Sequence, residues 1–189
     1  MFRQEKLEYT VDGGRWKRFF LYSIPIRLIQ ILVGLLPNSD PANRIRGFLM
    51  RPFFKSTGKN LQIASGVIAN RIDQVCLGDN VYLAHNSWIN GTGKIYIEDN
   101  VIIGPFCVVA STEHPFVDGV VSNNGTIVAP VRIGKGSWLA SHSVITLGTN
   151  VGLGNLICAN SVVNRDTEDY SMYGGIPAKK IKDLETPQK

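Results

Sequence analysis

Three histidines are the side chains of this chain that could act as a base near neutral pH. They are His85, His114 and His142, in a chain of 189 residues. Imidazole has an unperturbed pKa near neutrality, so it is the natural group to remove a proton from a hydroxyl. His114 stands apart because Pro115 follows it and opens an irregular stretch, PFVDGVVSNNGTIVA. A loop that projects from a rigid scaffold is a good place for a functional site.

The scaffold is indicated by an aliphatic residue that recurs every six positions. From Leu77 the units read LGDNVY, LAHNSW and INGTGK, and after two extra residues, Ile95 and Tyr96, they continue as IEDNVI, IGPFCV and VASTEH. Beyond the loop the units are IVAPVR, IGKGSW, LASHSV, ITLGTN, VGLGNL and ICANSV. Each unit predicts a short extended segment and a corner, and three units make a triangular turn. Stacked turns pair in parallel about 4.7–4.9 Å apart and bury the aliphatic columns. A sandwich of short strands would not keep this phase.

Three motifs add specificity to the repeat: STEHP at 111–115, IGKGSWLAS at 133–141 and YGGIPAKKIK at 173–182. With the repeat, they resemble the left-handed β-helix hexapeptide acyltransferases, in the branch of maltose, galactoside and polysaccharide O-acetyltransferases. The resemblance covers about Leu61 to Lys182. It implies an all-β fold, a left-handed parallel β-helix, and the left hand comes from the resemblance alone.

We therefore expect three parts. Residues 1–60 form a basic, partly helical N-terminal appendage, and residues 61–172 form the β-helix catalytic domain with a loop at 112–130. Residues 173–189 form a short C-terminal helix and a tail, after the turn made by GGIP.

The resemblance also implies roles for individual residues. His114 corresponds to the general base of the family, and Asn86 to a residue that contacts the acceptor sugar. Acetyl-CoA lies in a groove between the coils of a trimer in the related enzymes. The matching donor-side positions here are Trp138, Ser141, Ala159, Asn164, Arg165, Lys179 and Lys182.

Structural readings of some of these residues remain open. Asn86 also suits a corner that bonds its own backbone. Trp138 also suits a corner filler, and the terminal lysines also suit a solvated helix face. Lys180 lies beside Lys179 and could replace it. Three histidines also occur as zinc ligands in the γ-class carbonic anhydrases, which share this coil, but the wide spacing here argues against that site, and we expect no metal.

The charge is uneven. The net charge is +5 at pH 7, and the excess of Lys and Arg falls within the first 59 residues, around an apolar stretch, WKRFFLYSIPIRLIQILVGLL. This stretch suits a helix packed on the coil or one lying on an anionic membrane; Pro25, Arg27 and Gln30 argue against a membrane span. No nucleic-acid motif is present. Cys76, Cys107 and Cys158 show no zinc or redox spacing, and without a recognisable signal peptide we expect a cytoplasmic address, with contact at the inner membrane face.

These features and the resemblance together predict an acetyl-CoA-dependent O-acetyltransferase that acts as a homotrimer on a sugar hydroxyl. We expect the acceptor to belong to surface polysaccharide biosynthesis, such as capsule, lipopolysaccharide or exopolysaccharide. One alternative is an N-acetyltransferase of an amino sugar or an antibiotic-inactivating acetyltransferase, which would use the same base. Another is a trimeric scaffold without activity.

Overall fold

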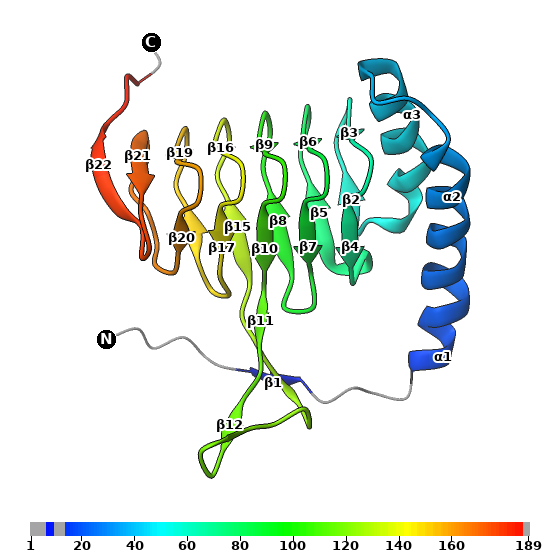
Figure 1. Cartoon of the computed structure of the whole chain (residues 1–189), viewed down its shortest axis with the longest axis horizontal. Coiled ribbons are helices and arrows are strands. Elements are labelled where there is room, and N and C mark those ends of the chain that lie inside the picture. Colours follow the sequence, from blue (N-terminus) through cyan, green and yellow to red (C-terminus); the bar gives the residue numbers. More distant parts are fainter. Residues whose placement is uncertain (1–6, 10–13, 187–189) are drawn as a thin grey trace.

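The computed structural model describes residues 7–9 and 14–186, and its centre is a triangular β-helix (Figure 1). The parts of the predicted appendage and tail at 1–6, 10–13 and 187–189 lie outside the described residues. The coil begins at β2 (Ser56–Thr57), before the predicted start at Leu61.

Three parallel sheets form the faces of the prism, and each coil contributes one strand to each face. The first face contains β2, β5 (Val75–Leu77), β8 (Ile95–Ile97), β15 (Val131–Ile133) and β18 (Asn150–Val151). The second face contains β3 (Gln62–Ile63), β6 (Tyr82–Leu83), β9 (Ile102–Ile103), β16 (Trp138–Leu139), β19 (Leu156–Ile157) and β21 (Ser171–Gly174), with β22 (Lys179–Asp183) at its edge. The third face contains β4 (Ile68–Asn70), β7 (Trp88–Asn90), β10 (Val108–Ala110), β17 (Val144–Ile145) and β20 (Val162–Val163).

The predicted aliphatic columns form the core. One side chain per strand points inward, and Leu83, Ile103, Leu139 and Ile157 are fully buried on the second face. A second inward position lies at each corner. Before the second face, Val81 and Val101 in the early coils give way to Ser137 and Asn155 in the later ones. The prism therefore buries one column of large residues for each face and fills its corners with smaller ones.

The extra residues in the repeat lie in a different place from the one predicted. Ile95 is fully buried and pairs with Val75 and Val131, so it belongs to a core column. The added length is taken up by the turn at 91–94, where Lys94 adopts φ 75°. Burying the isoleucine side chain stabilises the fold more than keeping the corner at a constant length would, so the corner accommodates the insertion. Ile127, by contrast, lies in the arm strand β14 and outside the columns, which resume at Val131.

The N-terminal segment forms helices that cover the first end of the coil (Figure 1). They are α1 (Arg15–Arg18), a π-helical turn (Phe19–Ser23), α2 (Ile24–Gly34), α3 (Asp40–Met50) and a 3-10 turn (Arg51–Phe53). Pro25 is accepted because it lies in the first turn of α2. Tyr22, Ile26 and Ile29 pack against the core, as expected for a helix packed on the coil. Within the described residues, no helix is both long enough and apolar enough to cross a membrane.

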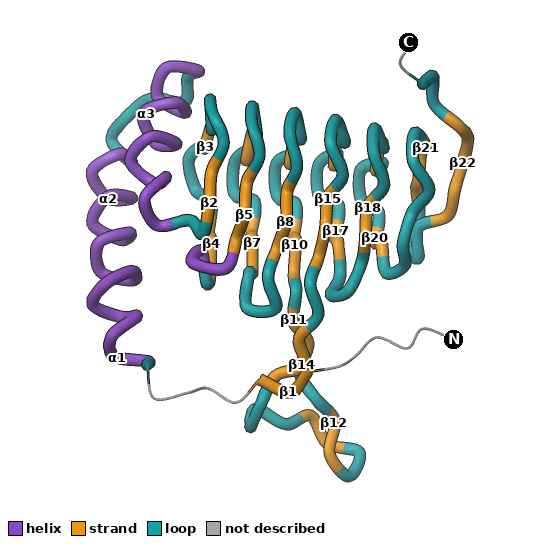
Figure 2. Tube along the Cα trace, turned by 180° about the vertical axis from the view of Figure 1, so that it is seen from behind, coloured by secondary structure: helices purple, strands orange, loops and turns teal. Residues whose placement is uncertain are grey.

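The predicted loop at 112–130 is an ordered arm that projects from the middle of the coil (Figure 2). At its root β11 (Thr112–Glu113) and β14 (Thr126–Val128) pair with each other, and β1 (Leu7–Tyr9) adds to β14 as a third strand. At its tip β12 (Phe116–Val117) and β13 (Val120–Val121) form a hairpin. Ser111 fixes the arm to the coil, because its hydroxyl donates to Asn90 O and accepts from the Gly93 N–H.

The predicted C-terminal helix is wrong. Lys179–Asp183 is the strand β22, which runs antiparallel to β21 and closes the far end of the coil (Figure 1). The last coil leaves a row of unpaired N–H and C=O groups along β21, and pairing with β22 satisfies them. A helix of this length would have been marginal on its own.

Candidate active site

His114 lies on the arm, directly after β11 and before the hairpin. Its side chain is exposed and makes no hydrogen bond to the described part of the chain. The arm leaves the coil at the corner where the third face passes to the first face of the next coil, which we call the third corner. The imidazole therefore stands clear of the prism and is free to contact a ligand or a second molecule.

Asn86, Ser141 and Ala159 lie together along one edge of the prism, where the second face turns into the third; we call this the second corner. Backbone hydrogen bonds stack its coils: the Asn86 N–H donates to Ser65 O (3.2 Å), and the Asn160 N–H donates to Ser141 O (3.1 Å). Asn86 and Ala159 are exposed and Ser141 is half-buried. The structure thus places the predicted acceptor residue and two donor residues on a common edge.

The backbone at the second corner explains part of the asparagine signal. Gly66, Asn86, Phe106, His142 and Asn160 occupy equivalent positions, all with φ between 56° and 76°. Asparagine and glycine adopt this left-handed conformation most readily, so Asn86 has a structural reason to be there. Its side-chain amide, however, makes no hydrogen bond within the described residues and remains available to a ligand.

Ser141 offers a backbone donor. Its N–H has no hydrogen-bond partner among the described residues, whereas its neighbour His142 donates to Pro105 O at 3.0 Å. An unpaired N–H on a rigid corner is preorganised to stabilise an oxyanion. The geometry is therefore compatible with the role expected for Ser141.

Two aromatic rings on the same edge were not singled out as a pair by the sequence. Phe106 and His142 stack with ring centroids 4.9 Å apart and an interplanar angle of 12°. They form an exposed flat surface between Asn86 and Ala159. The sequence did not reveal this stack, because the arm interrupts the repeat between Phe106 and His142. Only the folded coil brings the two rings together.

Trp138 lies on the outer side of the second face, half exposed at 50%. Successive strand pairs align it with Ile102 on one side and with Leu156, Met172 and Lys182 on the other. It is thus a face residue, not a corner filler, and it shares this face with Lys182.

The remaining donor residues gather at the last coil. Asn164 and Arg165 follow β20 and are exposed. The turn before β22 packs on β20, where the Ala178 N–H donates to Val162 O at 2.8 Å, so Lys179 lies near the same end. Lys180 is engaged elsewhere: its Nζ lies 2.7 Å from Asp183 Oδ1 and from Glu168 Oε2. The hydrogen bonds to these carboxylates raise the pKa of Lys180, Asp183 having the larger effect.

Cys107, by contrast, is an interior residue. Its thiol is fully buried, lies 3.1 Å from Ala140 O, and has a pKa raised by burial. No group of three or more metal-binding side chains occurs among residues 7–9 and 14–186.

Comparisons with known proteins bear on this arrangement. No family model matches the chain. The galactoside O-acetyltransferase of Escherichia coli K12 is 28% identical over 139 residues, which span 74% of this chain and 68% of that protein. A putative acetyltransferase of Staphylococcus aureus COL is 31% identical over 166 residues, which span 88% and 83%.

Solved structures share the fold. A maltose O-acetyltransferase from Clostridium difficile 630 superposes with a TM-score of 0.84 at 24% identity, over 96% of this chain and 94% of that one. A galactoside acetyltransferase in complex with coenzyme A gives a TM-score of 0.80 at 23% identity, over 94% and 86%.

Proposed function

Because the chain belongs to the hexapeptide-repeat acetyltransferases and has their left-handed β-helix, we propose that it transfers an acetyl group from acetyl-CoA to a sugar hydroxyl, with His114 as the general base. The observation that carries the proposal is the position of His114, exposed on an ordered arm of an otherwise regular coil. Relatives named for galactoside and maltose support a sugar as acceptor.

The reaction needs no covalent enzyme intermediate. His114 takes the hydroxyl proton as the oxygen attacks the thioester carbon, and the Ser141 N–H stabilises the resulting oxyanion. Collapse breaks the carbon–sulfur bond, and the imidazolium returns the proton to the leaving thiolate. The ester and the free thiol of CoA are the products.

We assign the donor to the groups at the second face, the second corner and the last coil. The pantetheine arm passes Ser141 and Ala159, beside Trp138. The nucleotide phosphates lie near Asn164, Arg165, Lys179 and Lys182, which supply positive charge and amide donors. Lys180 takes no part, because its ammonium is already held by two carboxylates.

A complete site requires more than one protomer in this proposal. The base is carried by an arm at the third corner, whereas Asn86, Ser141 and Ala159 lie along the second corner of the same prism. A homotrimer places the arm of one protomer against the second corner of its neighbour. The exposed apolar residues of the arm hairpin, Phe116, Val117, Val120 and Val121, support a contact between protomers.

We place the reaction in the cytoplasm, at the inner face of the membrane, in surface polysaccharide synthesis. Support comes from the helical segment, which exposes Leu28, Leu32 and Leu35 and also carries Lys17 and Arg18 near its start. Such a surface suits contact with anionic lipid.

The test is the His114→Ala variant. Turnover should fall by about 10²–10⁴-fold, the range typical of a lost general base. The dissociation constant for acetyl-CoA, measured by calorimetry, should stay near the wild-type value. Near-normal turnover in this variant would refute the assignment.

The acceptor is identified by thiol release against a panel of free sugars, amino sugars and aminoglycoside antibiotics. Turnover confined to unmodified sugars supports O-acetylation. Turnover only with amino compounds would replace it by N-acetylation, with the same base. A protein that binds no acetyl-CoA would be a scaffold.

A further inference from the structure

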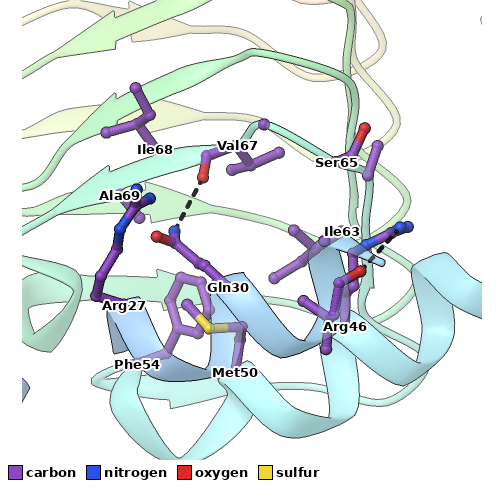
Figure 3. A pocket seen from close by; sticks show the side chains of 14 residues that line it. Arg27, Gln30, Arg46, Met50, Phe54, Ile63, Ser65, Val67, Ile68 and Ala69 are labelled. Atoms are coloured by element: carbon purple, nitrogen blue, oxygen red, sulfur yellow. Dashed lines mark hydrogen bonds between the residues drawn. The ribbon is translucent and has the colours of Figure 1, made fainter. Parts of the chain in front are cut away.

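A pocket lies between the helices and the first coil, outside the residues assigned to the reaction. Its volume is about 320 Å³, within the range of ligand sites, and α2, α3 and the first coil supply its walls (Figure 3). Its lining is largely apolar, with Val33, Met50, Phe54, Ile63 and Val67 among the residues. A second groove of about 610 Å³ adjoins it along α2 and shares Arg27, Gln30, Ile68 and Ala69.

The pocket carries positive charge and no negative charge. Arg27 and Arg46 both line it, and no Asp or Glu does. Figure 3 shows the Arg27 side chain extending from α2 toward β4, and it has no partner within the described residues. An apolar pocket with an unpaired guanidinium at its wall is complementary to an anion that bears a hydrocarbon chain.

Arg46 gives an independent sign of an anion. It is 2% exposed and pairs with no carboxylate in the part of the chain that the structure describes. Its guanidinium donates to carbonyls at the end of α2, including Leu36 O at 2.8 Å, but its buried Nε has no partner there. A buried charge without a counterion is costly, and a bound anion would reduce that cost.

The pocket also adjoins the proposed acceptor residue. Ser65 and Gly66, which line it, form the second corner of the first coil, one strand spacing from Asn86. Ser65 Oγ lies 3.0 Å from His85 Nδ1, and a side-chain carbon at Gly66 would meet the Asn86 amide oxygen. A ligand in the pocket would therefore end beside the place where the acceptor sugar binds.

We infer that this pocket holds the hydrocarbon chain of a lipid-linked acceptor, whose anionic phosphate is bound by Arg27, while the buried Arg46 on the opposite side of the pocket adds positive potential. The sugar attached to the phosphate then extends past Ser65 and Gly66 toward Asn86. The identity of the ligand as the acceptor rests on the proposed function, whereas the binding of an alkyl phosphate does not. Gln30 stays in place at the junction of pocket and groove, where its Nε2 donates to Val67 O at 3.3 Å (Figure 3).

The first experiment measures binding of n-decyl phosphate to the full chain by calorimetry, without acetyl-CoA and below the micellar concentration. We expect decyl phosphate to bind. Inorganic phosphate alone and decanol alone should each bind at least about tenfold more weakly, because each offers only one of the two kinds of interaction. Equal binding of decanol would overturn the anion site, and no binding of decyl phosphate would overturn the pocket.

Variants locate the ligand. Gly34 lines the pocket, and a Cβ added there meets no heavy atom within 4 Å, so Gly34→Trp fills space without a backbone clash. It should weaken decyl phosphate binding by roughly tenfold or more, whereas Gly34→Ala should not.

Arg27→Gln should weaken binding of decyl phosphate by about tenfold. The matched control Lys17→Gln, on the same helical segment but away from the pocket, should weaken it by less than about twofold.

A rival site is the exposed outer side of α2, and Leu32→Ser tests it. Loss of binding in Leu32→Ser with retention in Gly34→Trp would move the ligand to that surface and overturn the proposal. Sedimentation with and without decyl phosphate checks that the ligand does not merely displace a second copy of the chain.

The link to acetyl transfer is tested with the sugar that the acceptor panel identifies. Joined to decyl phosphate, that sugar should show a KM about tenfold lower than the free sugar, and Gly34→Trp should abolish the difference. Gly34→Trp should leave transfer to the free sugar unchanged. If the protein binds decyl phosphate but acetylates no sugar, the proposed function fails and the pocket stands; if the two KM values are equal in the wild type, the pocket does not serve the acceptor.

Discussion

Some asparagines of this chain have a structural position in the coil, and one of them, Asn86, also has a proposed role in binding the acceptor. Asparagine occupies left-handed corner positions at Asn60, Asn80, Asn86, Asn100 and Asn160. At the first corner, where the first face turns into the second, the amides of Asn60, Asn80 and Asn100 bond to one another along the coil, at 3.0 and 2.9 Å. Asn86, on the second corner, is outside this ladder. Its backbone conformation and its amide can therefore be tested separately.

Asn86→Gly and Asn86→Ala separate the two roles. Glycine keeps the left-handed corner and removes the amide, whereas alanine also costs about 1–2 kcal/mol of stability because its Cβ is strained there. Both variants should raise the KM for the sugar to the same extent and leave acetyl-CoA binding unchanged. Only Asn86→Ala should unfold at lower denaturant concentration. A wild-type KM in the glycine variant would assign Asn86 to the corner alone.

At the scale of elements, the two ends of the coil are closed by different means. The helices cover the first coil with an apolar side that includes Tyr22, Ile26 and Ile29. The far end is closed by the β21–β22 hairpin, in which Lys180 joins Glu168 and Asp183. Both ends hide strand edges that would otherwise recruit another chain.

The Lys180–Asp183 contact can be followed by titration. The hydrogen bond from the Lys180 ammonium lowers the pKa of Asp183, so the contact stabilises the hairpin above the ordinary carboxyl range and is lost as the pH falls through the lowered value. In Lys180→Met the pKa of Asp183, measured by NMR, should rise toward its ordinary value. Lys182→Met is the control and should leave it in place. An unchanged pKa in Lys180→Met would contradict the contact.

At the scale of the whole molecule, the protomer distributes the proposed site over different edges of one prism. The base stands on the arm at the third corner, and the acceptor and thioester residues stand on the second. A rigid coil cannot bring its own corners together, so the proposed function requires the groups to meet across protomers.

Mixing two inactive variants tests this. His114→Ala lacks the base, and Ala159→Trp blocks the pantetheine path. Random mixed trimers should recover about a quarter of wild-type activity, because three quarters of them contain both variants and each of those has one intact site in three. The variants are refolded together, and each alone serves as control. No recovery in trimers shown to be mixed would place the whole site within one protomer.

The sequence alone determined the coil. The sixfold spacing of aliphatic residues fixes which side chains point inward, and burial of Leu83, Ile103, Leu139 and Ile157 follows from it. The same spacing located the arm, since His114 stands where the phase ends. The family motifs could also be recognised from the sequence, because each is a short continuous segment at a fixed place in the repeat.

Tertiary structure decided the rest. The segment at 179–183 has no strong local preference for helix or strand, and pairing with the open edge of β21 makes it a strand. Ile95 entered the core because its neighbours in space, Val75 and Val131, are aliphatic, and the turn before it absorbed the extra length. The stack of Phe106 on His142 and the pocket beneath α2 join residues that are distant along the chain, and contacts of that kind are set by packing.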